Sequence, residues 1–281
     1  MISKKENEIL KNWKGNLKKP VVSICCTTYN HEKYISQAID SFLAQVTEFP
    51  FEVIIRDDAS TDKTAEIIRN YEENFPNILK PIYETENGFK KGIKPLPLVI
   101  SQVKGKYVAI CEGDDFWVDE NKLQKQVDFL ENNPDFSICF HSVIELYESS
   151  GEKKISNLNQ KENTTIKDLA ECNYIHTCSC VFRKSYEELP YWFLNSQMPF
   201  TDYAIHLINA QYGKIKFLNE TMAVYRIHDG GVWSVKSESY KKRKLIIFLN
   251  LLKDKFDSEI NEILLKQMYM SCSDLIRKKF R

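Results

Sequence analysis

The sequence lacks a long hydrophobic run, and this excludes a membrane-spanning helix. No segment of the 281 residues approaches the ~20 consecutive apolar residues that a span requires. Residues 1–20 contain no apolar stretch of the kind that a secretory signal peptide carries, so export is not supported. We therefore expect a cytoplasmic location, with any contact to the inner face of the plasma membrane being peripheral.

Two glycine-rich phosphate-binding motifs are also missing. The sequence contains neither G-x-G-x-x-G nor a P-loop, which argues against dehydrogenases and nucleoside triphosphatases. No internal repeat or low-complexity tract is apparent. A hydrophobic content of 43% with 12% aromatic residues is ordinary for a globular protein.

The formal net charge is zero, but the charges are unevenly distributed. Residues 1–20 carry six Lys against two Glu, a net charge of +4, and residues 241–281 carry eleven Lys and Arg against five acids, a net charge of +6. Residues 21–240, the body of the chain, therefore have a net charge of −10. An acidic body argues against nucleic-acid binding. The basic ends fit either solvated helix faces or attraction to an anionic membrane, worth about 1 kcal/mol per basic residue.

The eight cysteines indicate neither a disulfide framework nor a zinc site. There is no C-x-x-C pair, and the one dense cluster, Cys178 and Cys180 with His176 nearby, lacks a second ligand pair at zinc-site spacing. Four cysteines lie in apolar, strand-like runs: Cys25, Cys26, Cys111 and Cys139. We expect reduced thiols in the core of a cytosolic protein.

Strand and helix patterns alternate from residue 21 onward, which predicts an α/β fold with a mainly parallel sheet covered by helices. The predicted strands are 21–28, 51–60, 80–87 and 106–115. The predicted helices are 32–45, 64–75, with Ser60, Thr61 or Asp62 as its N-cap, and 121–134.

The second half is less regular. Segments 137–147 and 173–184 are strand-like, 148–165 is polar and predicts a loop, and 201–213 predicts a helix. Residues 214–231 predict one or two strands. From Tyr240, apolar residues at helical spacing predict amphipathic helices; they are Phe248, Leu252, Phe256, Ile260, Ile263 and Leu264.

Three polar clusters follow predicted strands, at 27–30, 57–60 and 112–115. Because ligands bind outside the carboxyl ends of parallel strands, we expect these clusters to converge on one crevice. The adjacent carboxylates Asp114 and Asp115 suit Mg²⁺ or Mn²⁺, whose coordination a substrate's phosphates complete. The alternative is an acidic turn that caps the next helix.

The segments "TTYNHEKYISQAIDSFLAQ", "FEVIIRDDASTDKTAEI" and "GKYVAICEGDDFWVDENKLQKQ", in this order and spacing, resemble the family 2 glycosyltransferases. These are inverting enzymes of the GT-A fold, with a Rossmann-like sheet, that use nucleotide-sugar donors. The resemblance covers residues 20 to about 135 and extends to about 235 through "TDYAIHLI" and "YRIHDGGVWS".

The resemblance implies roles for matching residues. Thr27 and Tyr29 would line the nucleobase pocket, and Asp58 would accept a hydrogen bond from uracil or thymine. The 112–115 segment corresponds to the family's D-x-D region, with Glu112 where the family often has Asp. The implied donor-binding residues are Thr27, Tyr29, Asn30, Asp57, Asp58, Glu112, Asp114, Asp115 and Arg226, and the implied metal ligands are Asp114, Asp115 and His228.

Inversion needs a general base that removes the proton of the acceptor hydroxyl. Asp202 is the candidate, because the family places an acidic residue there; the common Glu-Asp pair is Thr201-Asp202 in this chain. Alternatively, Asp202 is a carboxylate that only caps its helix. His176 and Trp233 either line the acceptor site or pack in the interior.

The resemblance implies a metal-dependent, hexosyltransferase-like enzyme of surface-polysaccharide assembly, using a UDP-sugar, Mn²⁺ or Mg²⁺, and a saccharide or lipid-linked acceptor. The expected organisation is a basic segment (1–19), a GT-A domain (20–238) and a basic helical region (239–281). The GT-A domain would divide into nucleotide-binding (20–135) and acceptor-binding (136–238) halves. The alternative is a non-catalytic, nucleotide-sugar-binding or scaffolding subunit. A nucleotidyltransferase is disfavoured, because it would need a Gly- and Lys/Arg-rich loop after the first strand, and the segment "TTYNHEKYI" does not supply one.

Overall fold

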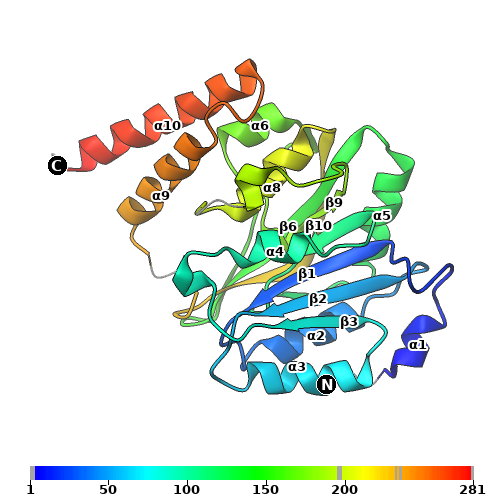
Figure 1. The fold of residues 1–281 in the computed structure, drawn as a ribbon. Helices are drawn as coiled ribbons and strands as arrows, with labels where there is room; N and C mark the ends of the chain where they lie inside the picture. Colours follow the sequence, from blue (N-terminus) through cyan, green and yellow to red (C-terminus); the bar gives the residue numbers. More distant parts are fainter. Residues whose placement is uncertain (1–3, 195–197, 232, 234–235, 280–281) are drawn as a thin grey trace.

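A mixed β-sheet with helices on both faces forms the centre of the protein (Figure 1). The computed structural model describes residues 4–194, 198–231, 233 and 236–279. Within these residues the main strand order is β3-β2-β1-β4-β9-β6-β10-β5, and β7 and β8 pair with β6 and β10.

The first half has the predicted alternation. Four strands pair in parallel: β1 (Val22–Thr28), β2 (Phe51–Asp57), β3 (Leu79–Tyr83) and β4 (Tyr107–Ile110). The other elements here are α2 (Ile35–Leu43), α3 (Thr64–Asn74), η1 (Phe89–Lys91), α4 (Pro95–Ile100), β5 (Phe116–Trp117) and α5 (Lys122–Asn132). Of the candidate caps for α3, Asp62 accepts a 2.9 Å hydrogen bond from the backbone N–H of Thr64.

Antiparallel pairings enter in the second half. Strands β6 (Phe136–Tyr147) and β10 (Lys214–Ile227) are parallel to each other, and β9 (Val181–Arg183) runs antiparallel between β4 and β6. The remaining elements are β7 (Glu152–Ile155), β8 (Asn163–Thr164), α6 (Ile166–Glu171), η2 (Thr177–Ser179), α7 (Tyr191–Leu194) and α8 (Thr201–Ala210).

Two predictions for this half were wrong. The strand predicted over 173–184 is limited to Val181–Arg183, because side chains occupy carbonyls that a strand ladder would use: Trp117 Nε1 donates to the Cys178 carbonyl and Gln126 Nε2 to the Ser179 carbonyl. The loop predicted over 148–165 contains β7 and β8. All four residues of β7 are exposed, so no apolar alternation marks it in the sequence.

The apolar core consists of two clusters, one on each face of the sheet. Alternate residues of β1 enter opposite clusters: Cys26 packs with residues of α2, α3 and α5, and Cys25 with residues of α4, α6 and α8. Six of the eight cysteines are buried, as predicted for core thiols, whereas Cys172 is exposed and Cys272 is partly exposed.

Both basic ends of the chain pack against the domain. Helix α1 (Glu6–Leu10) buries Ile9, and Glu6 accepts a 2.7 Å hydrogen bond from the backbone of Asn77. Helices α9 (Glu238–Leu251) and α10 (Ser258–Lys279) form a hairpin beyond α6 and α8 (Figure 1). Five of the six predicted apolar residues are buried there and Ile263 is partly buried; the five are Phe248, Leu252, Phe256, Ile260 and Leu264.

None of the helices in the described ranges has the length and apolar character needed to cross a bilayer. The predicted terminal segments include residues 1–3 and 280–281, which lie outside the described residues. The division into nucleotide-binding and acceptor-binding halves stays a prediction.

Candidate functional site

The carboxylates of the 112–115 segment follow β4 directly and lie beside the end of β1. The backbone N–H of Gly113 donates to the Thr27 carbonyl at 3.0 Å, which continues the β1–β4 pairing past the last residue of β4. A Cβ at Gly113 would lie 2.8 Å from Thr28 Oγ1 and 3.0 Å from Ile35 Cδ1. Glycine is therefore required here because the loop packs directly on β1 and α2.

We expect Gly113→Ala to lower the free energy of unfolding by about 1–3 kcal/mol, the usual cost of inserting a methyl group into a packed site. Thr28 and Ile35 are both buried, so neither can move away without disturbing the core. Urea denaturation of wild type and variant measures the change. An unchanged midpoint would show that the loop does not need this close approach.

Asp115 links this loop to the end of β10. Its carboxylate is 2% exposed and accepts a 2.8 Å hydrogen bond from the backbone N–H of Arg226. The Arg226 guanidinium donates in turn to the carbonyl of Asp114 and to the side chain of Gln37, and lies 3.4 Å from Glu148. Burial, together with the charges of Asp114 and Glu112, raises the pKa of Asp115. Asp115 thus positions the loop through Arg226.

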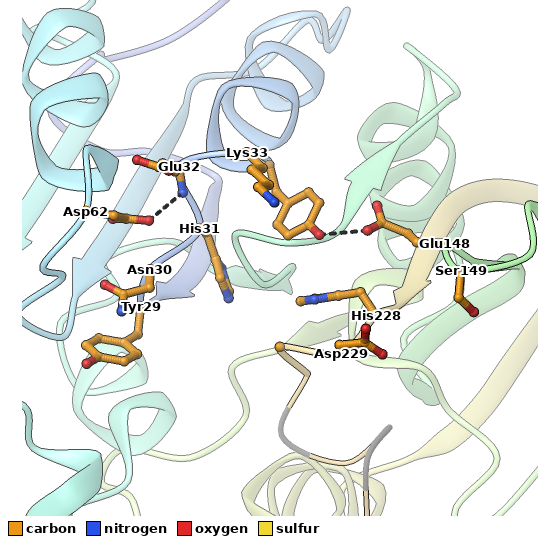
Figure 2. Close-up of a pocket in the computed structure, with 12 residues that line it drawn as sticks. Tyr29, Asn30, His31, Glu32, Lys33, Asp62, Glu148, Ser149, His228 and Asp229 are labelled. Carbon is orange, nitrogen blue, oxygen red and sulfur yellow. Dashed lines mark hydrogen bonds between the residues drawn. The ribbon is translucent and has the colours of Figure 1, made fainter.

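Asp114 faces two histidines. Its Oδ2 lies 3.1 Å from His228 Nε2 and 3.7 Å from His31 Nε2. Figure 2 shows His31 and His228 projecting toward each other from opposite sides of a cavity. Burial tends to raise the pKa of Asp114, but the hydrogen bond with His228 and the nearby His31 hold it below its ordinary value; the same hydrogen bond raises the pKa of His228.

The Asp114–His228 pair fits a divalent cation. Ligands bind Mg²⁺ at about 2.0–2.1 Å, so two neighbouring ligands at a right angle lie about 3 Å apart, close to the 3.1 Å between Asp114 Oδ2 and His228 Nε2. Among the described residues no group of three or more His, Cys, Asp or Glu could hold a metal ion. A cation here would therefore take its other ligands from a substrate and water.

Glu112 presents an unsatisfied oxygen beside this pair. Its Oε2 is buried and has no hydrogen-bond partner among the described residues. Burial and the charge of Asp114 raise the pKa of Glu112 to about 8. A buried oxygen without a partner is suited to accept a hydrogen bond from a bound ligand.

A cavity of about 610 Å³ brings several predicted residues together. Asp202 lies in its wall with the carboxylates of the 112–115 segment, although the two are separated by more than 80 residues in the sequence. The other predicted site residues in the wall are Thr27, Arg226 and Trp233. We call this space the main cavity.

Asp202 lies in the first turn of α8 and also borders a smaller cavity of about 360 Å³. Asn173 Nδ2 donates to its Oδ2 at 3.4 Å, and burial raises the pKa of Asp202. His176 borders the smaller cavity and lies 3.3 Å from Glu145, while Trp233 stacks on Phe200 with ring centroids 4.6 Å apart. Asp202 can therefore be reached from two sides.

A second cavity, of about 600 Å³, is lined by both His31 and His228 (Figure 2). Tyr29 and Asn30 line this second cavity, whereas Thr27 lines the main cavity, so the two predicted nucleobase residues border different cavities. Asp229 and Gly230 line both cavities. Asn30 Oδ1 accepts a 2.8 Å hydrogen bond from the backbone N–H of Thr61 and holds the β1 and β2 loops together.

Asp57 and Asp58 are buried and have protein partners. Asp57 accepts hydrogen bonds from the backbone and hydroxyl of Ser60, and Asp58 accepts from the backbone N–H groups of Gly88 and Phe89 at 3.1 and 3.0 Å. Neither residue borders the main cavity or the cavity in Figure 2. Their donor-binding roles stay predictions, and their observed contacts organise the loops around the site.

No role was predicted for His31 or Glu148 from the sequence. His31 follows β1 within the segment "TTYNHEKY", so its place after a strand end was a usable signal. Glu148 follows β6, and it accepts a hydrogen bond from the Tyr34 hydroxyl at 2.7 Å (Figure 2). The sequence of this polar region offered no signal for that contact.

Comparisons with known proteins agree with this architecture. Residues 23–190 match the sequence model of the family described as Glycosyl transferase family 2. An uncharacterized protein of Mycobacterium tuberculosis is 42% identical over 216 residues, which cover 75% of this chain and 60% of the relative. The chain thus spans about 60% of the length of that relative. Bacillus subtilis TuaG, whose name assigns it to teichuronic acid biosynthesis, is 28% identical over 245 residues, covering 82% of this chain and 86% of TuaG.

Solved structures share the fold. Staphylococcus aureus TarS in complex with UDP-GlcNAc gives a TM-score of 0.63 at 19% identity, covering 89% of this chain and 72% of that chain. The mannosyltransferase PcManGT from Pyrobaculum calidifontis, in complex with GDP-Man and Mn²⁺, gives 0.55 at 17% identity, covering 89% and 70%. At these identities the likeness is one of fold.

Proposed function

The chain belongs to glycosyl transferase family 2 and has the GT-A fold, and from this we propose that it is a metal-dependent, inverting glycosyltransferase using a UDP-sugar. The acceptor would be a hydroxyl of a saccharide or a lipid-linked saccharide in surface-polysaccharide assembly. TuaG is named for teichuronic acid biosynthesis, and the TarS structure contains UDP-GlcNAc, which supports the polymer class and the nucleotide.

One observation carries the proposal: Asp202 and the 112–115 carboxylates border the same cavity of about 610 Å³. An inverting transfer needs a base on one side of the anomeric carbon and charge stabilisation at the leaving group on the other. A single cavity that contains both kinds of group supports this assignment, and its volume suits a small-molecule substrate.

Each residue has a defined task in the proposed reaction. Asp202 accepts the proton of the acceptor hydroxyl as its oxygen bonds to the anomeric carbon, and the bond from that carbon to the diphosphate oxygen breaks with its electron pair. Asp115, held by the Arg226 backbone, keeps the loop in place. Glu112 Oε2 is available for a donor hydroxyl.

Asp114 and His228 are the proposed metal ligands, since their side chains meet at 3.1 Å. The metal-binding role of Asp115 stays a prediction, and its observed contact is with the Arg226 backbone. Mn²⁺ or Mg²⁺ bound there would supply Lewis-acid stabilisation of the charge that develops on the departing diphosphate. The PcManGT structure contains Mn²⁺, which supports a metal in this family.

We place the reaction on the cytoplasmic side, with the basic terminal segments available for peripheral contact with an anionic membrane. The proposed organisation retains a nucleotide-binding half (20–135), an acceptor-binding half (136–238) and a helical region (239–281). Incubation with a panel of UDP- and GDP-sugars, with Mn²⁺ or with EDTA, tests the activity. Release of UDP that requires the metal supports the proposal, and no release from any donor counts against it.

As the pH is lowered, the transfer rate should begin to fall at a higher pH than it would with a base that had the ordinary pKa of an aspartate. A base must be deprotonated to act, and burial raises the pKa of Asp202 above its ordinary value, so the rate is full above the raised pKa and is lost as pH falls through it. The measurement is kcat against pH at saturating donor. A rate that stays constant down to about pH 4 would contradict the role of Asp202.

A further inference from the structure

Three lysines that have no carboxylate partner among the described residues line one part of the main cavity. They come from separate segments: Lys94 precedes α4, Lys236 follows Trp233, and Lys244 belongs to α9. No ion pair joins any of them to Asp229 or to another carboxylate in the described residues. By contrast, two neighbouring lysines of α9 that do not line this cavity are paired, Lys241 with Glu238 and Lys242 with Asp274.

Each of these lysines lies over an aromatic ring. Lys94 Nζ lies 4.5 Å from the centre of the Phe89 ring, and the Nζ atoms of Lys236 and Lys244 each lie 5.6 Å from the centre of the Tyr240 ring. A ring attracts an ammonium group less strongly than a carboxylate does, so the three amines keep their capacity to bind an anion. Phe89 and Tyr240 also border the cavity and add apolar surface suited to a sugar ring.

The lysines belong to other segments of the chain than Asp114 and His228, the proposed cation ligands. Burial lowers the pKa of Lys94, and the one charged group that adds to the shift is Lys244, which also lowers it. The carboxylates of the 112–115 segment instead act on one another, on Arg226 and on the two histidines. The amines therefore form their own positive region within the same cavity.

We propose that Lys94, Lys236 and Lys244 bind a negatively charged group, a carboxylate or a phosphate, carried by one of the two sugar substrates. This inference rests on the proposed function, because it assigns a class of substrate to the same cavity. The charged group belongs either to the transferred sugar, as in a uronic acid, or to the acceptor, as in a sugar phosphate. It is distinct from the donor diphosphate, which the Asp114–His228 site serves.

Calorimetry with two pairs of probes distinguishes the sources. In the donor arm, with Mn²⁺ present, UDP-glucuronate is compared with UDP-glucose. In the acceptor arm, with saturating UDP and Mn²⁺, glucose 1-phosphate is compared with glucose. We expect the charged probe to bind at least about tenfold more tightly in one arm, since charge-assisted hydrogen bonds are stronger than neutral ones.

The double variant Lys94→Gln/Lys244→Gln should abolish that preference and leave the affinity for UDP within about threefold of wild type, because its diphosphate binds elsewhere. Lys241→Gln removes a charge from the same helix outside the cavity and should keep the preference. Lys94→Arg/Lys244→Arg keeps both positive charges and should also keep the preference for the charged probe. Thermal melting verifies that each variant is folded.

Two results would overturn the inference. The first is equal binding of charged and neutral probes in both arms. The second is a loss of UDP affinity in the glutamine double variant as large as the loss of the charged probe, since the lysines would then serve the diphosphate. A third result would separate the two proposals. If wild-type protein bound glucose 1-phosphate through these lysines but bound no UDP, the proposed function would be refuted and the anion site supported.

Discussion

Replacement of Asp202 by asparagine is expected to lower the rate of sugar transfer by about 10²- to 10⁴-fold, the range typical of a lost general base. Asparagine keeps the size of the side chain and can still accept a hydrogen bond from Asn173, which lies 3.4 Å from Asp202. Binding of the donor should change little, because the proposed cation site is built from other residues. The measurement is the turnover of the donor at saturating concentration, alongside the affinity for UDP.

A matched control separates catalysis from helix capping. Asp168 lies in the first turn of α6 as Asp202 lies in that of α8, but it accepts hydrogen bonds from Thr165 and Lys161 and borders none of the cavities described above. Asp168→Asn should keep the transfer rate within about threefold while lowering stability by about 0.3–1 kcal/mol, because the negative charge in the first turn is lost. A similar loss of rate in both variants would assign Asp202 a capping role alone.

The second large effect concerns Asp114. Asp114→Asn is expected to weaken the Mn²⁺-dependent binding of UDP by about 100-fold, because even the outer partners of metal ligands change metal affinity by 10- to 100-fold. Binding measured with EDTA present should be the same in wild type and variant, since the carboxylate would act through the metal. Calorimetric titration under both conditions gives the comparison.

Asp119→Asn is a suitable control for this variant. Asp119 follows the same loop, but its carboxylate accepts hydrogen bonds from Lys125 and from the backbone of Asn121. The affinity for UDP should be unchanged in this control. If Asp114→Asn bound UDP with Mn²⁺ as tightly as wild type does, Asp114 would not be a metal ligand.

Much of the fold of residues 20–135 could be predicted from the sequence. Strands β1, β2 and β4 are apolar runs that end in polar residues, and the geometry of a parallel sheet then requires those ends to meet. The resemblance added Asp202 and His228, which lie far along the chain. The structure brings Asp202 into the cavity of Asp114, and His228 into hydrogen-bond distance of Asp114.

Neighbouring residues with similar chemistry were harder to separate. Asp114 and Asp115 are indistinguishable as sequence, yet Asp114 faces two histidines while Asp115 is buried against the Arg226 backbone. Asn30 and Asp57 are polar residues at strand ends, as predicted for donor binding, but their observed contacts hold loops together. The direction of a side chain depends on tertiary contacts that a polar cluster does not reveal.

Contacts between distant segments account for most of what the sequence missed. The Cys178 and Ser179 carbonyls accept hydrogen bonds from the side chains of Trp117 and Gln126, which lie about 50 to 60 residues earlier, instead of pairing with a strand. The lysines of the main cavity come from positions 94, 236 and 244, and the basic run 241–244 does not show by itself which of its side chains faces a cavity. Periodicity describes single elements, and such sites arise only when the elements pack.

We propose that the carboxylates after β4 bind a metal-bound nucleoside diphosphate. Calorimetric titration of wild-type protein with UDP, GDP and CDP, each with Mn²⁺ and with EDTA, is the decisive experiment. UDP should bind with Mn²⁺, and EDTA should weaken this binding at least about tenfold. Absence of binding by every nucleotide under both conditions would contradict the transferase and favour a scaffolding subunit.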